Sequence, residues 1–473
     1  MTMTRRAMMK AAASAAWLAP GAFTIVPRSV LGGPGQTPPS EQIRIGLVGC
    51  GGRARQNLQG LLAAGDDGLR VVAVADPAET SDSRSLTIYR KLNGRRPMRE
   101  AIEEHYRRQR GLDGYAVAEF DRIDGMLAAD ADLDGVVIST PDHHHARDAL
   151  LALQAGKHVY CEKPLTHNLR ESAALAAASE RTTLATQMGN QGHSKPTQAE
   201  TVERIRAGQL GEIREVHAWV PAKRWNPSLV EPPSEGMPQP SGLDWNTWIG
   251  PRQPRPFHTA YVPVHWRDFP DFGCGALGDF ACHDLDSATW ALDLHHPTTI
   301  EAYSAGKTSD GLFPHGSLCR FEFPATDARG PVRVFWYDGG LMPTLPKAAQ
   351  PKIDEYRRGV LFVGDEASML CKRAGGEPWV MPHRGAVPDA PPPTIRRVAS
   401  HYADWLAAIR GGERPLSHFG YATRLNDITL LGVLAVRLGG RIDWDGAARR
   451  VTNRSDAQPI LEGTYRDGWE LPG

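Results

Sequence analysis

The 473-residue chain contains no run of 18 or more apolar residues, which excludes a segment that spans a bilayer as a helix on its own. It also lacks an excess of charge of either sign, because 54 Lys and Arg side chains balance 54 Asp and Glu side chains. A neutral balance gives no reason to expect nucleic acid or an anionic membrane surface as the partner. The length predicts two or three domains with substantial cores.

Cysteine is also scarce, with six residues in the whole chain. Cys50 lies inside a glycine-rich loop and Cys161 follows an apolar run, so neither placement suggests a disulfide framework. Cys274 and Cys282 are close enough in sequence to approach one another, and their pairing stays open. Cysteine usage therefore does not decide the redox compartment.

The N-terminus differs from everything after it. "MTMTRRAMMK" is followed by an alanine-rich segment and then by a Pro/Gly/Ser stretch without periodicity. This is the layout of an export signal and linker, and the Arg5-Arg6 pair resembles a twin-arginine signal. We therefore assign residues 1–40 to signal and linker and expect export of the folded protein to the periplasm by the twin-arginine machinery. The alternative is a short basic amphipathic start on a cytosolic enzyme.

A dinucleotide-binding pattern opens the next segment. The apolar residues of 43–48 predict a buried parallel strand, which runs into Gly49-x-Gly51-x-x-Ala54 and a helical pattern. Gly49 permits the tight turn, Gly51 lets the backbone approach a pyrophosphate, and Ala54 allows close packing of helix on strand. A lone glycine motif is weak evidence, so the context has to support it.

A second strand, "LRVVAVADP", supplies that context by ending at Asp76, about where a ribose-binding acid belongs. A carboxylate there accepts hydrogen bonds from the ribose hydroxyls and repels a 2′-phosphate, so NAD is favoured over NADP. Residues 79–114 are strongly charged and predict a helical excursion inserted on the surface.

Two further strands end in polar turns. The strand at 136–139 exits into Thr140 and Pro141, and the strand at 158–161 exits into "EKP", which is Glu162, Lys163 and Pro164. Ligands in open α/β sheets lie at the carboxyl ends of the strands. "TTLATQMGNQ" then predicts the strand that closes this sheet.

Three consecutive histidines, residues 143–145, invite a metal assignment. Adjacent residues point in different directions, and no fitting Cys or Asp cluster accompanies them. We therefore expect no metal site, and interpret these histidines as helix-entry residues that line the cofactor cleft.

The character changes near residue 193, where Trp, Pro and His become more frequent and alternating strands appear at 213–220, 298–306, 317–323 and 332–339. These predict a large antiparallel or mixed sheet, with one face on the dinucleotide domain and one free for self-association. Long irregular loops are usually functional, and one such proline-rich loop carries aromatics that can stack on sugar faces, about half of which we expect to be packing residues. They are Trp225, Trp245, Trp248, Tyr261 and Trp266.

"GALGDFACHDLDSATWAL" carries a second polar cluster. Asp279 and His283 are four residues apart and share one face of a helix, while Asp286 lies within reach to support the imidazole. A capped helix start with a satisfied histidine is the structural alternative. Farther on, amphipathic helices are predicted to pack on the core, with His401 and Asp404 on a helix surface rather than at the cleft.

At this point "GLVGCGGRA", "ISTPDHHHARDALLALQAGKHVYCEKPL" and "GALGDFACHDLDSATWAL" together resemble the Gfo/Idh/MocA oxidoreductase family, from about residue 43 to 453. The resemblance implies an NAD(P)-binding Rossmann domain at 41–192, a doubly wound parallel sheet. It implies a C-terminal α/β domain at 193–473, with a large, mostly antiparallel open sheet for substrate binding and oligomerisation. It also implies that Lys163 lies under the nicotinamide together with Asp279 and His283.

The expected activity is hydride transfer between a nicotinamide cofactor and a hydroxyl carbon of a sugar, cyclitol or glycoside. His283 has the pKa of a general base, Lys163 would steady the developing alkoxide, and Asp279 would orient a neighbouring hydroxyl. Glu162 would accept hydrogen bonds from the cofactor or orient the lysine. The cofactor, expected to be tightly bound NAD, would be held by Gly49, Gly51, Gly52, Arg53, Asp76, Thr140, Pro141, His145, Glu162, Lys163 and Gln191.

Two other functions remain open. Some relatives use bound NAD for transient oxidation and elimination, so that the net reaction is glycoside hydrolysis, although "GDFACHD" is closer to the dehydrogenase pattern. A sugar or dinucleotide sensor without turnover is the second alternative, and the intact Lys163, Asp279 and His283 speak against it.

Overall fold

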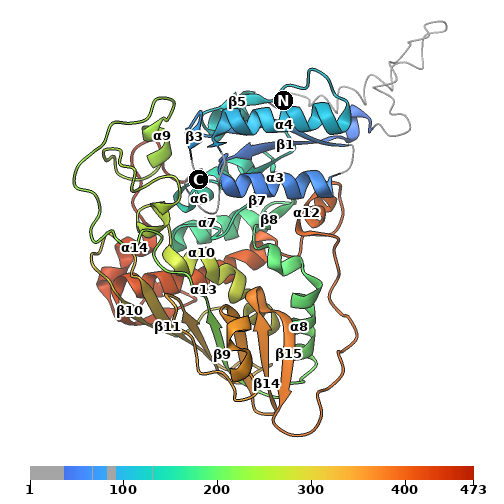
Figure 1. Cartoon of the computed structure of the whole chain (residues 1–473), viewed down its shortest axis with the longest axis vertical. Coiled ribbons are helices and arrows are strands. Elements are labelled where there is room, and N and C mark those ends of the chain that lie inside the picture. Colours follow the sequence, from blue (N-terminus) through green and yellow to red (C-terminus); the bar gives the residue numbers. More distant parts are fainter. Residues whose placement is uncertain (1–36, 66–67, 83–91, 130–131) are drawn as a thin grey trace, which may run out of the picture.

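The computed structural model describes residues 37–65, 68–82, 92–129 and 132–473 (Figure 1). The expected twin-arginine signal lies almost entirely outside these residues. Within the described part of the chain, no helix combines the length and apolar character needed to cross a membrane.

The first domain is built on a parallel sheet in the order β5-β2-β1-β6-β7-β8, which is the doubly wound arrangement. The predicted Rossmann domain is thereby confirmed, and the "TTLATQMGNQ" strand forms its edge. The strands are β1 Ile43–Val48, β2 Leu69–Ala75, β5 Ala118–Phe120, β6 Gly135–Ile138, β7 His158–Cys161 and β8 Thr186–Met188. The helices are α3 Gly52–Ala64, α4 Arg95–Arg110, α5 Ile123–Ala129, α6 Asp142–Gln154 and α7 Leu169–Glu180. A two-stranded ribbon, β3 Ser81–Asp82 with β4 Leu92–Asn93, precedes α4.

Helix α4 corrects one expectation from the sequence. Residues 83–91 of the segment 79–114 lie outside the described part of the chain. Helix α4 is not a surface excursion, because its residues Met98, Ile102 and Tyr106 are buried in one cluster with the residues of β1 and β2. The charged residues of α4 occupy its outer face, and its apolar residues form a narrow stripe at helical spacing. The composition of the helix therefore suggests a surface position although one face is buried. Helix α4 therefore covers the sheet.

The second domain carries a nine-stranded sheet in the order β15-β14-β13-β9-β12-β11-β10-β16-β17. Only β9 and β12 pair in parallel, so the sheet is mixed and mostly antiparallel, as predicted. Its strands are β9 Ile213–Trp219, β10 Thr299–Ala305, β11 Gly316–Phe323, β12 Val332–Tyr337, β13 Gly359–Gly364, β14 Ala367–Lys372, β15 Gly376–Pro382, β16 Gly440–Asp445 and β17 Arg450–Val451.

The helices of this domain are α8 Pro196–Arg206, α9 Trp245–Ile249, α10 Gly275–Asp284, α11 Asp286–Ala291, α12 His401–Ile409, α13 Phe419–Leu438 and α14 Gln458–Glu462. Helices α8 and α13 contact strands of the nine-stranded sheet, α11 packs on α8, and α10 packs on α13. Short 3-10 turns are η2 Pro39–Glu41, η3 Gln191–Ser194, η4 His265–Asp268, η5 Gln350–Tyr356, η6 Arg373–Gly375 and η7 Ser455–Ala457.

Helix α13 joins the two domains. It contacts α7 and β8 on one side and β10 and β11 on the other, and nearly all of its residues are buried. One continuous apolar cluster runs from β6 and β7 through α13 into the second sheet. Because this core is shared, the side chains of α10 are held in a fixed position relative to the ends of the Rossmann strands.

Helix α12 lies against α3, although the two are separated by most of the chain (Figure 1). A Cβ atom on Gly60 of α3 would lie 2.1 Å from the ring of Tyr402, so the glycine lets the tyrosine approach. His401 and Asp404 are 4% and 2% exposed, which contradicts the expectation of a helix surface. His401 Nε2 lies 2.8 Å from the Met188 carbonyl oxygen, at the end of β8.

Candidate active site

The turn after β1 has the geometry of a phosphate cradle. Gly49 has φ +82°, and a Cβ there would lie 2.7 Å from the backbone of Ser139 and Thr140. A Cβ on Gly51 would meet nothing within 4 Å, so the space above the turn is open. Helix α3 begins at Gly52, and its first N–H groups face this space. These features fit the pyrophosphate of a dinucleotide.

Asp76 follows β2, and its carboxylate binds a backbone N–H group of the turn after β1. Its Oδ2 accepts a hydrogen bond from the Cys50 backbone N–H at 2.6 Å, and its Oδ1 accepts one from the Ala78 N–H at 2.8 Å. Each oxygen keeps a second lone pair for another donor. The structure therefore places the carboxylate beside the glycine loop, where a ribose would approach it.

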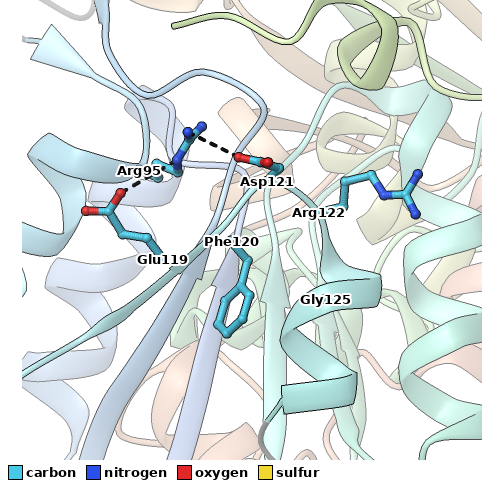
Figure 2. Close-up of a pocket in the computed structure, with 6 residues that line it drawn as sticks. All are labelled: Arg95, Glu119, Phe120, Asp121, Arg122 and Gly125. Atoms are coloured by element: carbon cyan, nitrogen blue, oxygen red, sulfur yellow. Dashed lines mark ion pairs between the residues drawn. The ribbon is translucent and has the colours of Figure 1, made fainter.

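A cavity of about 590 Å³ opens at the carboxyl end of β5, where Glu119, Phe120 and Asp121 line it (Figure 2). Arg95 lines it and pairs with Glu119 at 3.6 Å and Asp121 at 3.1 Å, while its Nη1 donates to the Asp76 carbonyl oxygen at 2.9 Å. Two carboxylates thus offset the charge of Arg95, which leaves it poorly suited to a 2′-phosphate. The sequence analysis missed this cavity, because β5 is three residues long and gives almost no periodic signal.

Glu162, the first residue of the "EKP" turn, is 3% exposed. Its Oε1 accepts hydrogen bonds from Arg53 Nε at 2.8 Å, Asn57 Nδ2 at 3.0 Å and Gln191 Nε2 at 3.0 Å. Burial alone would raise the pKa of Glu162, but Arg53 and Lys163 hold it below its ordinary value. A Cβ on Gly189 would lie 2.6 Å from the carboxylate, so glycine is required there.

Two buried acceptors beside this network have no donor. Glu162 Oε2 and Thr140 Oγ1 are both buried and unpaired among the described residues. An unpaired buried polar atom costs about 1–3 kcal/mol, so such atoms usually face a ligand or water. Together with the open cradle at Gly51, they fit the hydroxyl groups of a bound dinucleotide.

The histidines at the start of α6 brace the site rather than form a ligand cluster. His145 places Nδ1 2.7 Å from the Pro164 carbonyl oxygen and Nε2 2.9 Å from the Thr140 carbonyl oxygen. Pro141 is the N-cap residue of α6. His143 and His144 likewise lie against the Trp248 carbonyl oxygen. Through its contacts with Thr140 and Pro164, His145 connects the turns that follow β6 and β7.

Lys163 meets Asp279 from the other domain. Lys163 Nζ donates to Asp279 Oδ1 and to its carbonyl oxygen, each at 2.6 Å, and Arg267 Nε donates to the same Oδ1 at 3.2 Å. Burial opposes ionisation of Asp279, but the two cations hold its pKa well below the ordinary value. The structure therefore brings together the ammonium and the carboxylate that the sequence proposed.

His283 lies one helical turn beyond Asp279 on α10 and is half-buried. Burial lowers its pKa well below the ordinary value, and the positive charges of Lys163, Arg358 and Arg53 lower it further. The imidazole is therefore neutral at pH 7 and able to accept a proton.

Asp286 does not support His283, which corrects the sequence prediction. Its carboxylate lies 3.0 Å from His193 Nδ1 and accepts a hydrogen bond from the Tyr421 hydroxyl at 2.5 Å. Asp286 begins a separate helix, α11, so the spacing of three residues from His283 does not place the two on one helical face.

Most of the aromatic residues of the proline-rich segment form a small core of their own. Trp245, Trp248, Tyr261 and Trp266 are buried in one cluster with Phe269 and Phe272. Trp225 lies outside this cluster and is half-buried, so it is the one of the five predicted aromatics that retains an accessible face. All six cysteines are free and buried, and Cys274 and Cys282 are unpaired.

Tyr402 is a part of the site that sequence reasoning missed. Its hydroxyl donates to Asn57 Oδ1 at 2.8 Å, and Asn57 Nδ2 donates to Glu162 Oε1. The ring also stacks on Tyr160 with the centroids 5.7 Å apart. The C-terminal segment thus fixes the orientation of the Asn57 amide, and no sequence pattern links residue 402 to residue 57.

The Tyr402→Phe variant should bind NAD about 5–10-fold more weakly, which corresponds to about 1 kcal/mol for one lost hydrogen bond. The Asn57 amide would then lose the hydrogen bond that fixes Oδ1 and would be held through Nδ2, which donates to Ser139 Oγ and Glu162 Oε1, so its hydrogen bond to Glu162 would be less well oriented. We expect kcat at saturating cofactor to change less than about twofold. Calorimetric titration with NAD measures the affinity.

Tyr115→Phe is the matched control, because the Tyr115 hydroxyl also donates within this domain, to the Val71 carbonyl oxygen at 2.9 Å, but away from Glu162. Equal losses of NAD affinity in the two variants would show that Tyr402 acts only through stability.

Comparison with known proteins gives the family. Residues 43–190 match the sequence model described as "Oxidoreductase family, NAD-binding Rossmann fold", and residues 229–315 match "Oxidoreductase family, C-terminal alpha/beta domain". The chain is 26% identical over 193 residues to 1,5-anhydro-D-fructose reductase of Ensifer adhaerens, which covers 39% of this chain and 46% of that protein. It is 30% identical over 178 residues to inositol 2-dehydrogenase 1 of Saccharopolyspora erythraea, which covers 37% of this chain and 44% of that protein.

The chain therefore spans less than half the length of these two relatives. A crystal structure of the WlbA dehydrogenase from Bordetella pertussis, in complex with NADH and UDP-GlcNAcA, superposes with a TM-score of 0.54 at 17% identity over 85% of this chain and 99% of that chain. At this identity the likeness shows the fold alone. Because both domains match models of one family and its relatives include sugar and cyclitol dehydrogenases, the chain belongs to the Gfo/Idh/MocA family of NAD-binding oxidoreductases.

Proposed function

We propose that the protein oxidises or reduces a hydroxyl-bearing carbon of a sugar, cyclitol or glycoside with NAD as the redox partner. The observation that carries this proposal is the ion pair between Lys163 and Asp279, which lies close enough to His283 for both charges to act on its pKa. Lys163 comes from the turn after β7 and the other two come from α10, so the cluster spans the two domains.

Each residue has a role that its surroundings support. The neutral His283 accepts the proton of the reacting hydroxyl, and Lys163 donates a hydrogen bond to the oxygen as its negative charge develops. Both cations bind Oδ1 of Asp279, so its carboxylate is held beside the ammonium, where it can position a second hydroxyl of the substrate. When bound, the nicotinamide supplies the hydride acceptor or donor.

The cofactor assignment rests on Asp76 and on the pairing of Arg95. The Asp76 carboxylate would repel a 2′-phosphate on the adenosine ribose. Arg95, the nearby cation, already pairs with Glu119 and Asp121. NAD fits this surface better than NADP. Native mass spectrometry of the purified protein measures which dinucleotide it retains, and retained NADP would contradict the assignment.

A panel of sugars, cyclitols and glycosides tests the reaction itself. Stoichiometric NADH with an oxidised product supports the dehydrogenase. Free sugar released from a glycoside without net NADH would instead show an NAD-dependent hydrolase, and sugar binding without either product would show a sensor.

The proposal has two further parts. Export to the periplasm rests on the sequence of residues 1–40, and fractionation of cells that express wild type and the Arg5→Lys, Arg6→Lys double variant tests it.

Self-association would use the outer face of the nine-stranded sheet, where His217 stacks on Phe335 with the centroids 4.7 Å apart and Tyr303 is 58% exposed. Light scattering of the purified protein measures the oligomeric state.

A further inference from the structure

We propose that a second cavity, lined by none of the residues assigned to the candidate active site, binds a small organic phosphate. Its volume is about 370 Å³, which is within the range of small-molecule sites. It lies where the end of α8, helix α11 with the loop after it, and the start of α13 meet. The residues that line it include Arg206, Trp290, His418, Gly420, Tyr421 and Arg424.

Two arginine side chains on different helices border this cavity. Arg206, the last residue of α8, donates from Nη2 to the Trp290 carbonyl oxygen at 2.8 Å. Arg424 of α13 places its central carbon 5.5 Å from the ring centroid of Tyr421. The positive charges of both arginines act on the phenol of Tyr421, so the two guanidinium groups lie around the same ring.

A third guanidinium, that of Arg414, lies at the edge of the cavity. A Cβ on Gly420, which lines the cavity, would lie 3.4 Å from Arg414 Nη2. Burial and the positive charges of Arg414 and Arg424 lower the pKa of His418 to about 4. The imidazole is therefore neutral at pH 7, and the positive charge at this end of the cavity belongs to the arginines.

The balance of charge around the cavity favours an anion. Asp293 is the carboxylate that lines it, and it pairs with Arg424 at 2.6 Å. Asp293 and His295 both contact Nη1 of Arg424, so these two residues do not engage its other N–H groups. Across the ranges that the structure describes, no carboxylate lies within ion-pair distance of Arg206 or Arg414. Two positive charges are therefore left for a ligand.

A phosphate group matches this arrangement better than a carboxylate does. A phosphate monoester carries a charge of about −1.5 to −2 at pH 7 and has three terminal oxygens that accept hydrogen bonds. A carboxylate has a single charge and two oxygens. Guanidinium groups form strong, charge-assisted hydrogen bonds to phosphate oxygens, and three of them at one cavity offer donors to all three oxygens.

Trp290 supplies a surface for the organic part of the ligand. Its indole ring is half-buried and stacks on His193 with the centroids 4.0 Å apart and an interplanar angle of 24°. His193 is held in turn by Asp286 at 3.0 Å. One face of the indole is thus covered, and its accessible part borders the cavity, where a sugar or a nucleobase attached to the phosphate can pack against it.

Calorimetric titration of the NAD-saturated protein with inorganic phosphate, glucose 6-phosphate and AMP tests the inference. Saturation with NAD fills the dinucleotide site, which would otherwise bind the same phosphates. At about 0.15 M ionic strength we expect glucose 6-phosphate or AMP to bind with a Kd below about 1 mM. The organic phosphate that binds more tightly than inorganic phosphate identifies the ligand as a sugar phosphate or a nucleotide. Equal affinities for all three probes, or no binding of any, would overturn the inference.

The Arg206→Gln, Arg414→Gln double variant should bind the phosphate at least about tenfold more weakly and keep its affinity for NAD. Both side chains are exposed, so the melting temperature should stay close to that of wild type. The matched control is the Arg214→Gln, Arg450→Gln double variant, which removes the same charge from side chains of β9 and β17 that are 60% and 66% exposed. Unchanged phosphate binding in the first variant, or equal losses in both, would contradict a site at this cavity.

Discussion

Replacing Lys163 with alanine should lower kcat by about 10³-fold while the protein stays folded and retains NAD. The ammonium is the donor placed nearest to the reacting oxygen in the proposed mechanism, so its removal leaves the developing negative charge without this hydrogen bond. Arg267 still pairs with Asp279 in the variant, so this carboxylate keeps a cation at 3.2 Å and the fold should survive. Single-turnover measurement of NADH formation at saturating NAD reports the chemical step.

Lys372→Ala provides the control for Lys163→Ala. Lys372 is a residue of β14 whose side chain is 42% exposed and pairs with Glu377 at 2.8 Å, far in sequence from the catalytic cluster. Surface ion pairs of this kind contribute about 0–1 kcal/mol, so activity and melting temperature should remain close to wild type. A Lys163→Ala protein that contains NAD and retains more than a tenth of wild-type kcat would contradict the catalytic assignment.

The parts of the fold that local sequence patterns determine were predicted correctly. A continuous apolar run followed by glycines, as in β1 and the turn after it, is typical of a Rossmann fold. The alternating apolar and polar residues of the second domain are typical of a mostly antiparallel sheet. The meeting of Lys163 with Asp279 followed from the resemblance rather than from local patterns. Nothing in the residues alone specifies that a turn after β7 faces a helix more than a hundred residues later.

The errors arise where tertiary contacts decide the outcome. The charges of α4 outnumber its three buried residues, so composition suggested a surface helix although the apolar stripe is narrow and real. Asp286 is three residues from His283 in sequence, but the break between α10 and α11 turns it toward His193. Tyr402 acts through Asn57 across 345 positions of the chain, a separation that no periodicity reports.

Replacing His283 with glutamine should lower kcat/KM by about 10³-fold and change the dependence on pH. The neutral imidazole is the proposed base, and burial together with Lys163, Arg358 and Arg53 lowers its pKa in the folded protein. The acid limb of kcat/KM should therefore lie below pH 6.5, with a plateau from there to pH 8.

The same shift links His283 to stability. Because the pKa is lower in the folded state than in the unfolded chain, unfolding takes up a proton below about pH 6.5 and the free energy of unfolding falls as the pH falls. The His283→Gln variant should lose this part of the acid sensitivity, whereas His258→Gln, at a half-buried histidine of the proline-rich segment, should keep it together with normal activity. Urea denaturation at a series of pH values measures the difference. An acid limb centred above pH 6.5 would contradict the assignment of His283 as a neutral base. Identical pH profiles in His283→Gln and wild type would contradict it as well.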